Sequence, residues 1–207
     1  MPAPLMEEAM RWFGPADTVT LEEIRQTGAT AVFSALHEVP YGQVWPMESI
    51  LQRRAQIEAA GLRWTAVESV PVHESIKTRT EGCSEAIAAY QETLRRLGAA
   101  GLQTVIYNFM PVLDWVRTDL HYRLADGAEA LLYDPVKFAA FDLFALGRKG
   151  AEADFPPPVR AAAARYWADL GVAGQQAFTR QTLDLFPGVK LNVSLDDLRA
   201  MLARYGT

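Results

Sequence analysis

The stretch VIYNFMPVLDWVRTD, residues 105–119, decides the fold prediction because a short apolar run in it ends abruptly at Asn108. Val105 and Ile106 are typical of a buried strand, since β-branched side chains pack well on a pleated surface. The loop after this strand carries polar and aromatic side chains, namely Asp114, Trp115, Arg117 and Asp119. In α/β proteins such loops converge on one crevice, where ligands bind. The stretch therefore predicts a strand that leads into part of a ligand site.

The same pattern of strand, polar loop, helix and glycine occurs earlier in the chain. Thr20 and Glu23 have capping-box spacing, in which each side chain satisfies a free N–H at the start of a helix. The alternation indicates parallel strands joined by right-handed helical crossovers. Strands are expected at residues 9–13, 29–36, 62–67 and 102–107, and helices at 21–27, 47–60 and 84–100.

Two of the expected helices carry apolar residues at helical spacing, which predicts the faces that they bury. In the helix at 47–60 these residues are Met47, Ile50, Leu51 and Ile57. In the helix at 84–100 they are Ile87, Tyr90, Leu94 and Leu97.

Two architectures fit this alternation, a doubly wound sheet and a (β/α)8 barrel. The sequence has no G-x-G-x-x-G turn after the first predicted strand, which weakens the dinucleotide-binding version of the doubly wound sheet. Polar residues follow every predicted strand instead of gathering at one switch point, and this arrangement favours the barrel. We therefore favour the barrel, of which the sequence shows four βα units.

The alternation breaks after Asp119. Residues 121–134 predict a β-hairpin, because Asp126-Gly127 is a favoured hairpin turn. We predict a single domain over residues 1–207, with four βα units in 1–119 and a hairpin with a helical extension in 120–207. Helices of this extension are expected at residues 135–146, 158–170 and 175–185 and after Ser194.

Composition limits the class of protein. The chain has 207 residues, of which 50% are hydrophobic, and a net charge of -5 that argues against nucleic-acid binding. Cys83 is the only cysteine, which indicates a reducing compartment without a disulfide framework. No apolar run approaches the roughly 20 residues of a membrane span, and the N-terminus does not have the pattern of a signal peptide. We therefore expect a soluble, cytoplasmic protein without nucleic-acid or membrane partners.

Several longer runs resemble the mannonate dehydratase family, specifically its N-terminal part. The runs are MRWFGPADTVTLEEIRQTGAT (10–30), HEVPYGQVWPMESI (37–50), VESVPVHESIKTR (67–79) and YNFMPVLDWVRTDL (107–120), with FAAFDLF and GAEADF further on. The resemblance covers residues 6–155 well and the rest loosely. It implies a partial TIM barrel of the sugar-isomerase type, made of the first four βα units with a hairpin and a helical segment. It also implies a hydro-lyase that converts D-mannonate to 2-keto-3-deoxy-D-gluconate and water in glucuronate catabolism.

The resemblance further implies a divalent metal, Mn²⁺ or Fe²⁺. The family's metal-binding motifs belong to its second half: a His-Pro-Asp-Asp stretch, a cysteine in a Cys-x-Gly-Ser stretch and a His-Leu-Arg segment. None of these motifs occurs in this sequence. The chain therefore resembles one half of the enzyme, a fragment or a truncated gene product. We expect no metal ligand, catalytic acid or catalytic base in it, and no activity from the 207-residue chain by itself.

Candidate substrate-binding residues stand at the ends of the predicted strands and in the loops that follow. Arginine suits a carboxylate bidentately, tryptophan can cover a sugar face, and histidine and asparagine can exchange hydrogen bonds with sugar hydroxyls. A glutamate can orient a hydroxyl or support a metal ligand. The candidates are Arg11, Trp12, His37, Glu68, His73, Asn108, Trp115, Arg117 and Asp119.

A structural interpretation stands beside each functional one. Trp12 could belong to the core, His37 could bind its own loop backbone, and Glu68 could pair with a nearby arginine. Asn108 could cap its strand. A structural ion pair with a packed tryptophan would explain the loop residues Trp115, Arg117 and Asp119.

Three hypotheses for the function remain open. The chain could be the N-terminal half of a mannonate dehydratase, which binds a sugar acid. It could instead be a non-catalytic remnant or an assembly module, or another sugar isomerase or epimerase on the same fold. Because an open half-barrel exposes unpaired N–H and C=O groups and an apolar inner face, we expect a homo-oligomer or association through the open edges.

Overall fold

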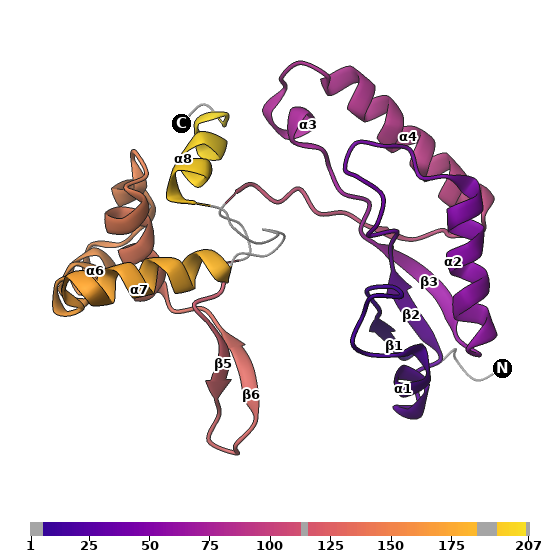
Figure 1. Ribbon diagram of the computed structural model, residues 1–207, viewed down its shortest axis with the longest axis horizontal. Helices are drawn as coiled ribbons and strands as arrows, with labels where there is room; N and C mark the ends of the chain where they lie inside the picture. The colour runs from indigo at the N-terminus through magenta and orange to yellow at the C-terminus, as the bar shows by residue number, and fades with distance from the viewer. Residues whose placement is uncertain (1–5, 113–115, 186–193, 206–207) are drawn as a thin grey trace. The chain divides into compact units, whose positions relative to one another are not determined.

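The computed structural model describes residues 6–112, 116–185 and 194–205. The chain divides into two compact units, Met1–Phe109 and Met110–Thr207. The first unit is built on a parallel sheet and the second is mainly helical (Figure 1). Of the helices in the described residues, none is both long enough and apolar enough to span a bilayer. The expectation of a single domain over residues 1–207 stays a prediction.

The first unit has the alternation of strands and helices that the sequence predicts. Its four strands form one parallel sheet in the order β1-β2-β3-β4, so that each strand pairs with the preceding one (Figure 1). This arrangement is consistent with the first part of a TIM barrel. The elements are β1 (Ala9–Arg11), α1 (Leu21–Gln26), β2 (Ala31–Ser34), α2 (Met47–Ala59), β3 (Arg63–Glu68), α3 (Glu74–Thr78), α4 (Cys83–Ala99) and β4 (Val105–Ile106).

The predicted start of α1 is confirmed. The hydroxyl of Thr20 accepts a hydrogen bond from the N–H of Glu23 at 3.1 Å, and the Glu23 carboxylate accepts one from the N–H of Thr20 at 2.8 Å. The two side chains therefore satisfy two N–H groups that the first turn leaves without partners. The hydrogen bonds that the Glu23 carboxylate accepts from the N–H and the hydroxyl of Thr20 hold the pKa of Glu23 below its ordinary value.

One face of the sheet is packed against α1, α2 and α4. Because side chains alternate along a strand, the register places Arg11, Phe33 and Glu68 on the opposite face. In a barrel the face covered by helices is the outer one, so these three residues belong to the inner face. Buried core residues include Ile24, Val32, Ile50, Ile57, Trp64, Val67 and Leu97.

The predicted buried face of α4 is shifted by about one residue. Ile87 and Leu94, both predicted to be buried, are 40% and 37% exposed. Thr93 occupies a buried position because its hydroxyl has a main-chain partner, the N–H of Trp45 at 3.1 Å. The buried side chains of α4 are Ala86, Thr93 and Leu97, with Tyr90 packed beside them.

The predicted face of α2 is also partly wrong. Leu51 is exposed, and Arg53 is buried on the same face as Ile50 and Ile57. The apolar pattern misplaced this face because it treats every arginine as a surface residue.

The fourth strand is shorter than predicted. A strand was expected over residues 102–107, and β4 contains only Val105 and Ile106, which pair with Val67 and Glu68. Within the described residues β4 pairs on one side only, and an edge strand with a single partner is stabilised less than a central one.

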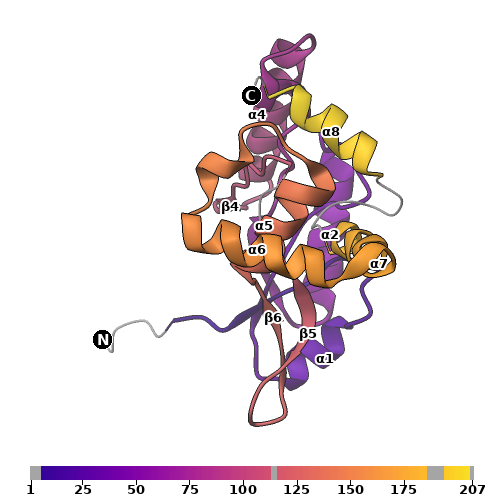
Figure 2. The same cartoon turned by 90° about the vertical axis from the view of Figure 1, so that its left-hand side faces the viewer.

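The second unit begins with the predicted hairpin. Its strands are antiparallel, and Gly127 adopts the positive φ of 91° that the Asp126-Gly127 turn requires. The hairpin extends away from the helices of its unit (Figure 2). The elements are β5 (Asp119–Arg123), β6 (Glu129–Leu132), α5 (Pro135–Ala140), a π-helix η1 (Phe141–Leu146), a 3₁₀ helix η2 (Ala151–Asp154), α6 (Pro157–Asp169), α7 (Gly171–Asp184) and α8 (Leu195–Ala203).

A buried ion pair stabilises the π-helix. Asp142 is 0% exposed, and both of its carboxylate oxygens accept hydrogen bonds from Arg148, at 2.6 to 3.1 Å. Arg148 also donates to Asp154 at 2.6 Å. These bonds raise the pKa of Arg148 above its ordinary value, so the guanidinium remains charged.

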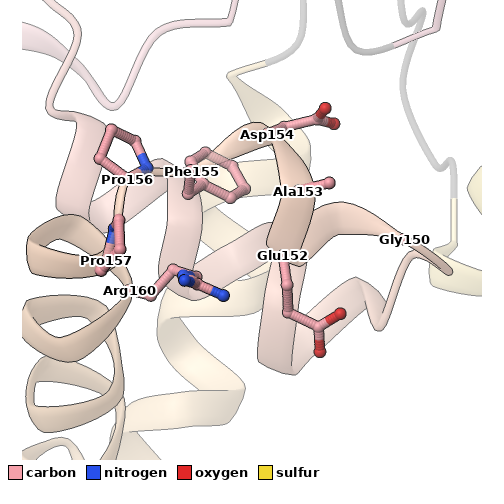
Figure 3. Close-up of a pocket in the computed structure, with 8 residues that line it drawn as sticks. All are labelled: Gly150, Glu152, Ala153, Asp154, Phe155, Pro156, Pro157 and Arg160. Carbon is pink, nitrogen blue, oxygen red and sulfur yellow. The ribbon is translucent and has the colours of Figure 1, made fainter.

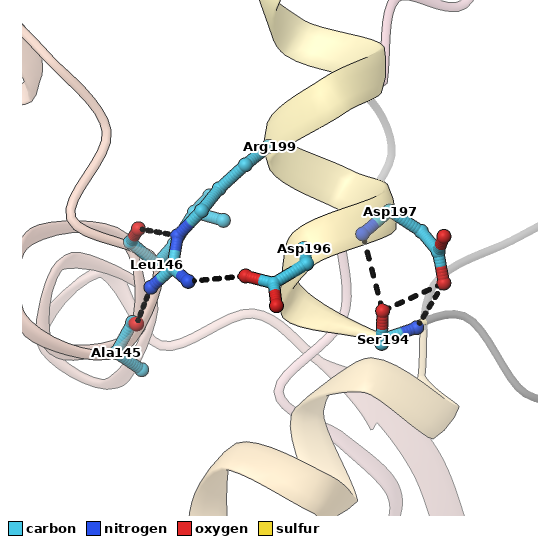
Figure 4. Close-up of polar contacts among 6 residues, drawn as sticks. All are labelled: Ala145, Leu146, Ser194, Asp196, Asp197 and Arg199. Carbon is cyan, nitrogen blue, oxygen red and sulfur yellow. Dashed lines mark hydrogen bonds and ion pairs between the residues drawn. The ribbon is translucent and has the colours of Figure 1, made fainter.

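The end of the π-helix is held by α8 (Figure 4). Arg199 donates hydrogen bonds to the carbonyls of Leu146 at 2.9 Å and Ala145 at 3.0 Å. These carbonyls lie in the last turn, where a helix leaves its acceptors without partners. The helix α8 itself begins after Ser194, as predicted, and a capping box of Ser194 and Asp197 stabilises its first turn.

We expect Asp142→Ala to destabilise the second unit by about 3 kcal/mol, because it leaves a largely buried guanidinium without its main partner. Urea unfolding followed by circular dichroism measures this loss. The matched control is Asp196→Ala, which removes the exposed carboxylate that pairs with Arg199. It should cost at most about 1 kcal/mol. Equal losses in the two variants would contradict the role given to Asp142.

Candidate functional site

Three candidate residues gather where β1, β2 and β3 end. Arg11 Nη1 lies 3.1 Å from Glu68 Oε1, so the two residues form an ion pair across the inner face of the sheet. The Arg11 guanidinium also lies 4.4 Å from the centre of the Phe13 ring, and the ring of His37 lies 5.6 Å from the same ring. Arg11, Phe13, His37 and Glu68 are called the strand-end cluster below. The cluster combines a cation, a carboxylate and an imidazole at the ends of three neighbouring strands.

The imidazole of His37 is biased towards its neutral form. Partial burial lowers the pKa of His37, and the positive charges of Arg11 and Arg53 lower it further. The carboxylates of Glu38 and Asp17 act in the opposite direction without cancelling the shift. A neutral imidazole donates a hydrogen bond from one nitrogen and accepts one at the other, which suits a hydroxyl group.

Arg53 is a residue of this region that the sequence reasoning missed. Its guanidinium donates to the carbonyl of Ala35 at 2.6 Å and to both carboxylate oxygens of Glu38 at 3.0 and 3.1 Å. It also lies over the ring of Trp12, 5.3 Å from its centre. One signal in the sequence could have found it: Arg53 follows Ile50 by three positions and precedes Ile57 by four, on the buried face of α2.

His73 stands at the start of α3. Its Nδ1 accepts a hydrogen bond from the N–H of Ser75 at 3.2 Å and contacts the Ser75 hydroxyl at 2.8 Å. The ring also packs on Gly42, where a Cβ would lie 2.9 Å from the imidazole. This contact joins the loop after β3 to the loop after β2. A contact between His73 and a substrate would have to use Nε2.

The loop after β2 is also held by α4. The N–H of Trp45 donates to the hydroxyl of Thr93, and the carbonyl of Trp45 accepts a hydrogen bond from Arg96, each at 3.1 Å. The Trp45 side chain is buried in the core. Both ends of the segment that carries His37 are therefore fixed by main-chain contacts with helices.

The remaining candidates lie in different surroundings. Trp12 is 3% exposed and belongs to the core, and Asn108 is half-buried just after β4. Arg117 and Asp119 belong to the second unit, where Asp119 accepts a hydrogen bond from the N–H of His121 at 2.8 Å. Trp115 lies outside the described residues.

The second unit carries an open depression on its surface (Figure 3). Its charged side chains do not converge, since Glu152 and Asp154 point in different directions and Asp154 is bound to Arg148. It carries no clear site for a ligand. The lining residues are Gly150, Glu152, Ala153, Asp154, Phe155, Pro156, Pro157 and Arg160.

The side chains in the described part of the chain do not form a metal site. Within residues 6–112, 116–185 and 194–205, no three His, Cys, Asp or Glu side chains are grouped so that they could hold a metal ion. These residues therefore do not fit the divalent cation that the family resemblance implies.

Comparison with known proteins decides the family. A family model described as D-mannonate dehydratase (UxuA) matches residues 6–207. The chain belongs to the mannonate dehydratase family. This result confirms the resemblance that the sequence runs carry.

Individual members of the mannonate dehydratase family support the same assignment. The chain is 50% identical over 200 residues to a mannonate dehydratase from Chromohalobacter salexigens, a match that covers 97% of this chain and 51% of the relative. The chain is also 48% identical over 200 residues to a mannonate dehydratase from Marinomonas sp., a match that covers 97% of this chain and 51% of that relative. The chain thus spans about half the length of the curated relatives that it matches.

The crystal structure of mannonate dehydratase from Streptococcus suis serotype 2 resembles this structure with a TM-score of 0.60 and 33% identity. The match covers 98% of this chain and 48% of that one. The predicted partial TIM barrel is confirmed by this likeness together with the four-stranded parallel sheet.

Acid should destabilise the first unit through His37. Because its pKa is lower in the folded chain than the roughly 6.5 of the unfolded chain, the unfolded state takes up the proton first as the pH falls. Stability is therefore complete above about pH 6.5 and declines as the pH falls towards the folded pKa. Urea unfolding of wild type and His37→Gln at about pH 7.5 and about pH 5.5 tests this. The carboxylates titrate in both proteins, so wild type should lose more free energy of unfolding than the variant, and equal losses would contradict the shift.

Proposed function

We propose that the chain supplies the N-terminal half of a mannonate dehydratase, a hydro-lyase that converts D-mannonate to 2-keto-3-deoxy-D-gluconate and water in glucuronate catabolism. The observation that carries the proposal is the 50% identity with a mannonate dehydratase over 97% of this chain. Because the match covers 51% of that relative, the reaction would need the C-terminal half as well. A cytoplasmic location agrees with the single cysteine.

The reaction places clear demands on the site. Removing the proton from C2 of the aldonate moves negative charge onto the carboxylate, which becomes an enediolate. The C3 hydroxyl then leaves with a proton as water, and the resulting enol becomes the 2-keto group. Cationic and hydrogen-bonding groups near the carboxylate lower the barrier because they bind the charge that develops.

The strand-end cluster could bind the negative charge that develops on the substrate carboxylate. We assign Arg11 to the substrate carboxylate, with Glu68 as the residue that orients its guanidinium at 3.1 Å. Neutral His37 would exchange hydrogen bonds with a sugar hydroxyl, and Asn108 after β4 would act similarly. The base and the acid would come from the C-terminal half.

The other candidates have supporting roles in the proposal. Trp12 would support Arg53 from the core, and His73 would contact substrate only through Nε2. Substrate contacts from Trp115, Arg117 and Asp119 stay predictions, and a structural role for this loop stays equally open.

The metal in the proposal is manganese or iron, as the family resemblance implies. A divalent cation would supply positive charge to an enediolate. Its ligands are assigned to the C-terminal half, and the roles proposed for this chain do not depend on it.

A second candidate function is an assembly module. Within the described residues, β1 and β4 each pair on one side, and Phe13, Tyr107 and Phe109 near the strand ends are exposed. Open edges and exposed aromatic side chains favour association with another chain. The partner could be a second copy or a chain that carries the remaining strands.

We expect the chain alone to be inactive and a mixture with the C-terminal half of the Chromohalobacter salexigens enzyme to convert D-mannonate. The assay uses chain shown to be folded by circular dichroism, with Mn²⁺ or Fe²⁺ added. Turnover by the chain alone would contradict the division of roles. A stable oligomer of the chain that stays inactive in the mixture would favour the assembly module. Conversion of a keto-sugar in place of D-mannonate would favour an isomerase.

In the active mixture, Arg11→Gln should lower kcat/KM for D-mannonate by about 10- to 100-fold, the usual effect of losing one hydrogen bond to a charged group. The matched control is Arg95→Gln, which removes an exposed arginine that pairs with Glu92 on α4. The control should stay within about twofold of wild type. An Arg11 variant as active as the control would remove Arg11 from the site.

A further inference from the structure

Arg53 is an unusual residue in the core of the first unit. It is 4% exposed, between Ile50 and Ile57 on the buried face of α2. An arginine does not lose its charge in a protein, so its burial requires partners that compensate for lost water. The carbonyl of Ala35 and the carboxylate of Glu38 are those partners.

The two partners stand on either side of His37. Ala35 precedes it by two residues and Glu38 follows it directly, so one guanidinium holds a main-chain carbonyl on one side of His37 and a carboxylate side chain on the other. The guanidinium has little room to move. It lies over the ring of Trp12, and a Cβ on Gly14 would come within 2.9 Å of Nη1. Arg53 therefore ties the end of β1 to the end of β2.

We propose that Arg53 is a positioning residue, which fixes the place of His37 without itself contacting substrate. The inference rests on the proposed function, because it gives His37 the task of binding a hydroxyl of the sugar acid. A planar guanidinium suits this task, since it can hold a carbonyl and a carboxylate at once in a fixed geometry.

The charges around His37 support the same role. Four charged side chains act on the imidazole of His37. They are Arg11 on β1, Asp17 in the loop before α1, the adjacent Glu38 and Arg53 on α2. The two arginines and partial burial lower the pKa of His37, while the two carboxylates raise it. Without the charge of Arg53, His37 would take up a proton at a higher pH. As an imidazolium it could only donate hydrogen bonds.

The first test follows His37 by NMR in the full chain. Arg53→Gln should raise the pKa of His37, because it removes a nearby positive charge. Arg53→Lys should leave this pKa close to wild type and weaken the contact between the rings of His37 and Phe13, seen as a smaller nuclear Overhauser effect. Arg95→Gln is the matched control and should change neither quantity. An unchanged pKa in Arg53→Gln, or an unchanged ring contact in Arg53→Lys, overturns the proposal.

The second test measures kinetics in the mixture with the C-terminal half. Arg53→Lys should lower kcat/KM for D-mannonate by about tenfold. An ammonium group lacks the planar array of donors with which the guanidinium binds the Ala35 carbonyl and the Glu38 carboxylate at once. Arg53→Gln should also move the acid limb of the pH profile to higher pH. A purely structural residue would change the amount of folded protein and leave this limb in place. That result would overturn the proposal.

If neither Arg53 variant folds, Glu38→Gln decides the matter. Glu38 is exposed, so the variant should fold, and it removes the carboxylate that Arg53 holds next to His37. We expect a loss of about 3- to 10-fold in kcat/KM, and activity within twofold of wild type would overturn the proposal. A wild-type mixture without turnover would count against the proposed function, and the NMR titration would still decide the role of Arg53.

Discussion

The first unit depends on the need to satisfy one buried positive charge. Arg53 lies among aliphatic side chains, where an unpaired guanidinium would cost more than the fold could support. Its donors therefore require the Ala35 carbonyl and the Glu38 carboxylate at fixed positions. This requirement holds the residues on both sides of His37 against α2, next to the candidate site.

Arginines on helices perform a similar task throughout the chain. Several of them, Arg53, Arg54, Arg96 and Arg199 among them, donate to main-chain carbonyls of segments distant in sequence. These hydrogen bonds fix the positions of loops and helix ends. The pairs are Arg53 with Ala35, Arg54 with Ala100, Arg96 with Trp45, and Arg199 with Ala145 and Leu146.

Much of the fold could be predicted from the sequence because its signals are local. The capping box of Thr20 and Glu23 and the turn at Asp126-Gly127 act within a few residues, and both are confirmed. The burial of Thr93 and Arg53 could not be predicted from apolar periodicity. Each is buried because of a partner far along the chain, which no short pattern contains. The predicted length of β4 was wrong for a related reason: the length of an edge strand depends on how many residues of the neighbouring strand pair with it.

The candidate site was predictable in outline because its residues follow directly after predicted strands. The rule that ligands bind beyond the ends of parallel strands selected Arg11, His37 and Glu68, and the structure brings these three together. The ion pair between Arg11 and Glu68 depends on strand order and register, which the sequence pattern leaves undetermined. Phe13, which lies between Arg11 and His37, gave no signal because an aromatic residue at the end of a predicted strand is usually core.

The order of strands in the sheet has a consequence for how the chain acquires its structure during synthesis. Each strand pairs with the strand that precedes it in the sequence, so the sheet can grow by one strand at a time from the N-terminus. Such growth closes only short loops, which keeps the entropic cost of each step small. A nascent chain could therefore form β1 to β3 with their helices before β4 is made. Within the described residues, β4 would then be the last strand to join this sheet.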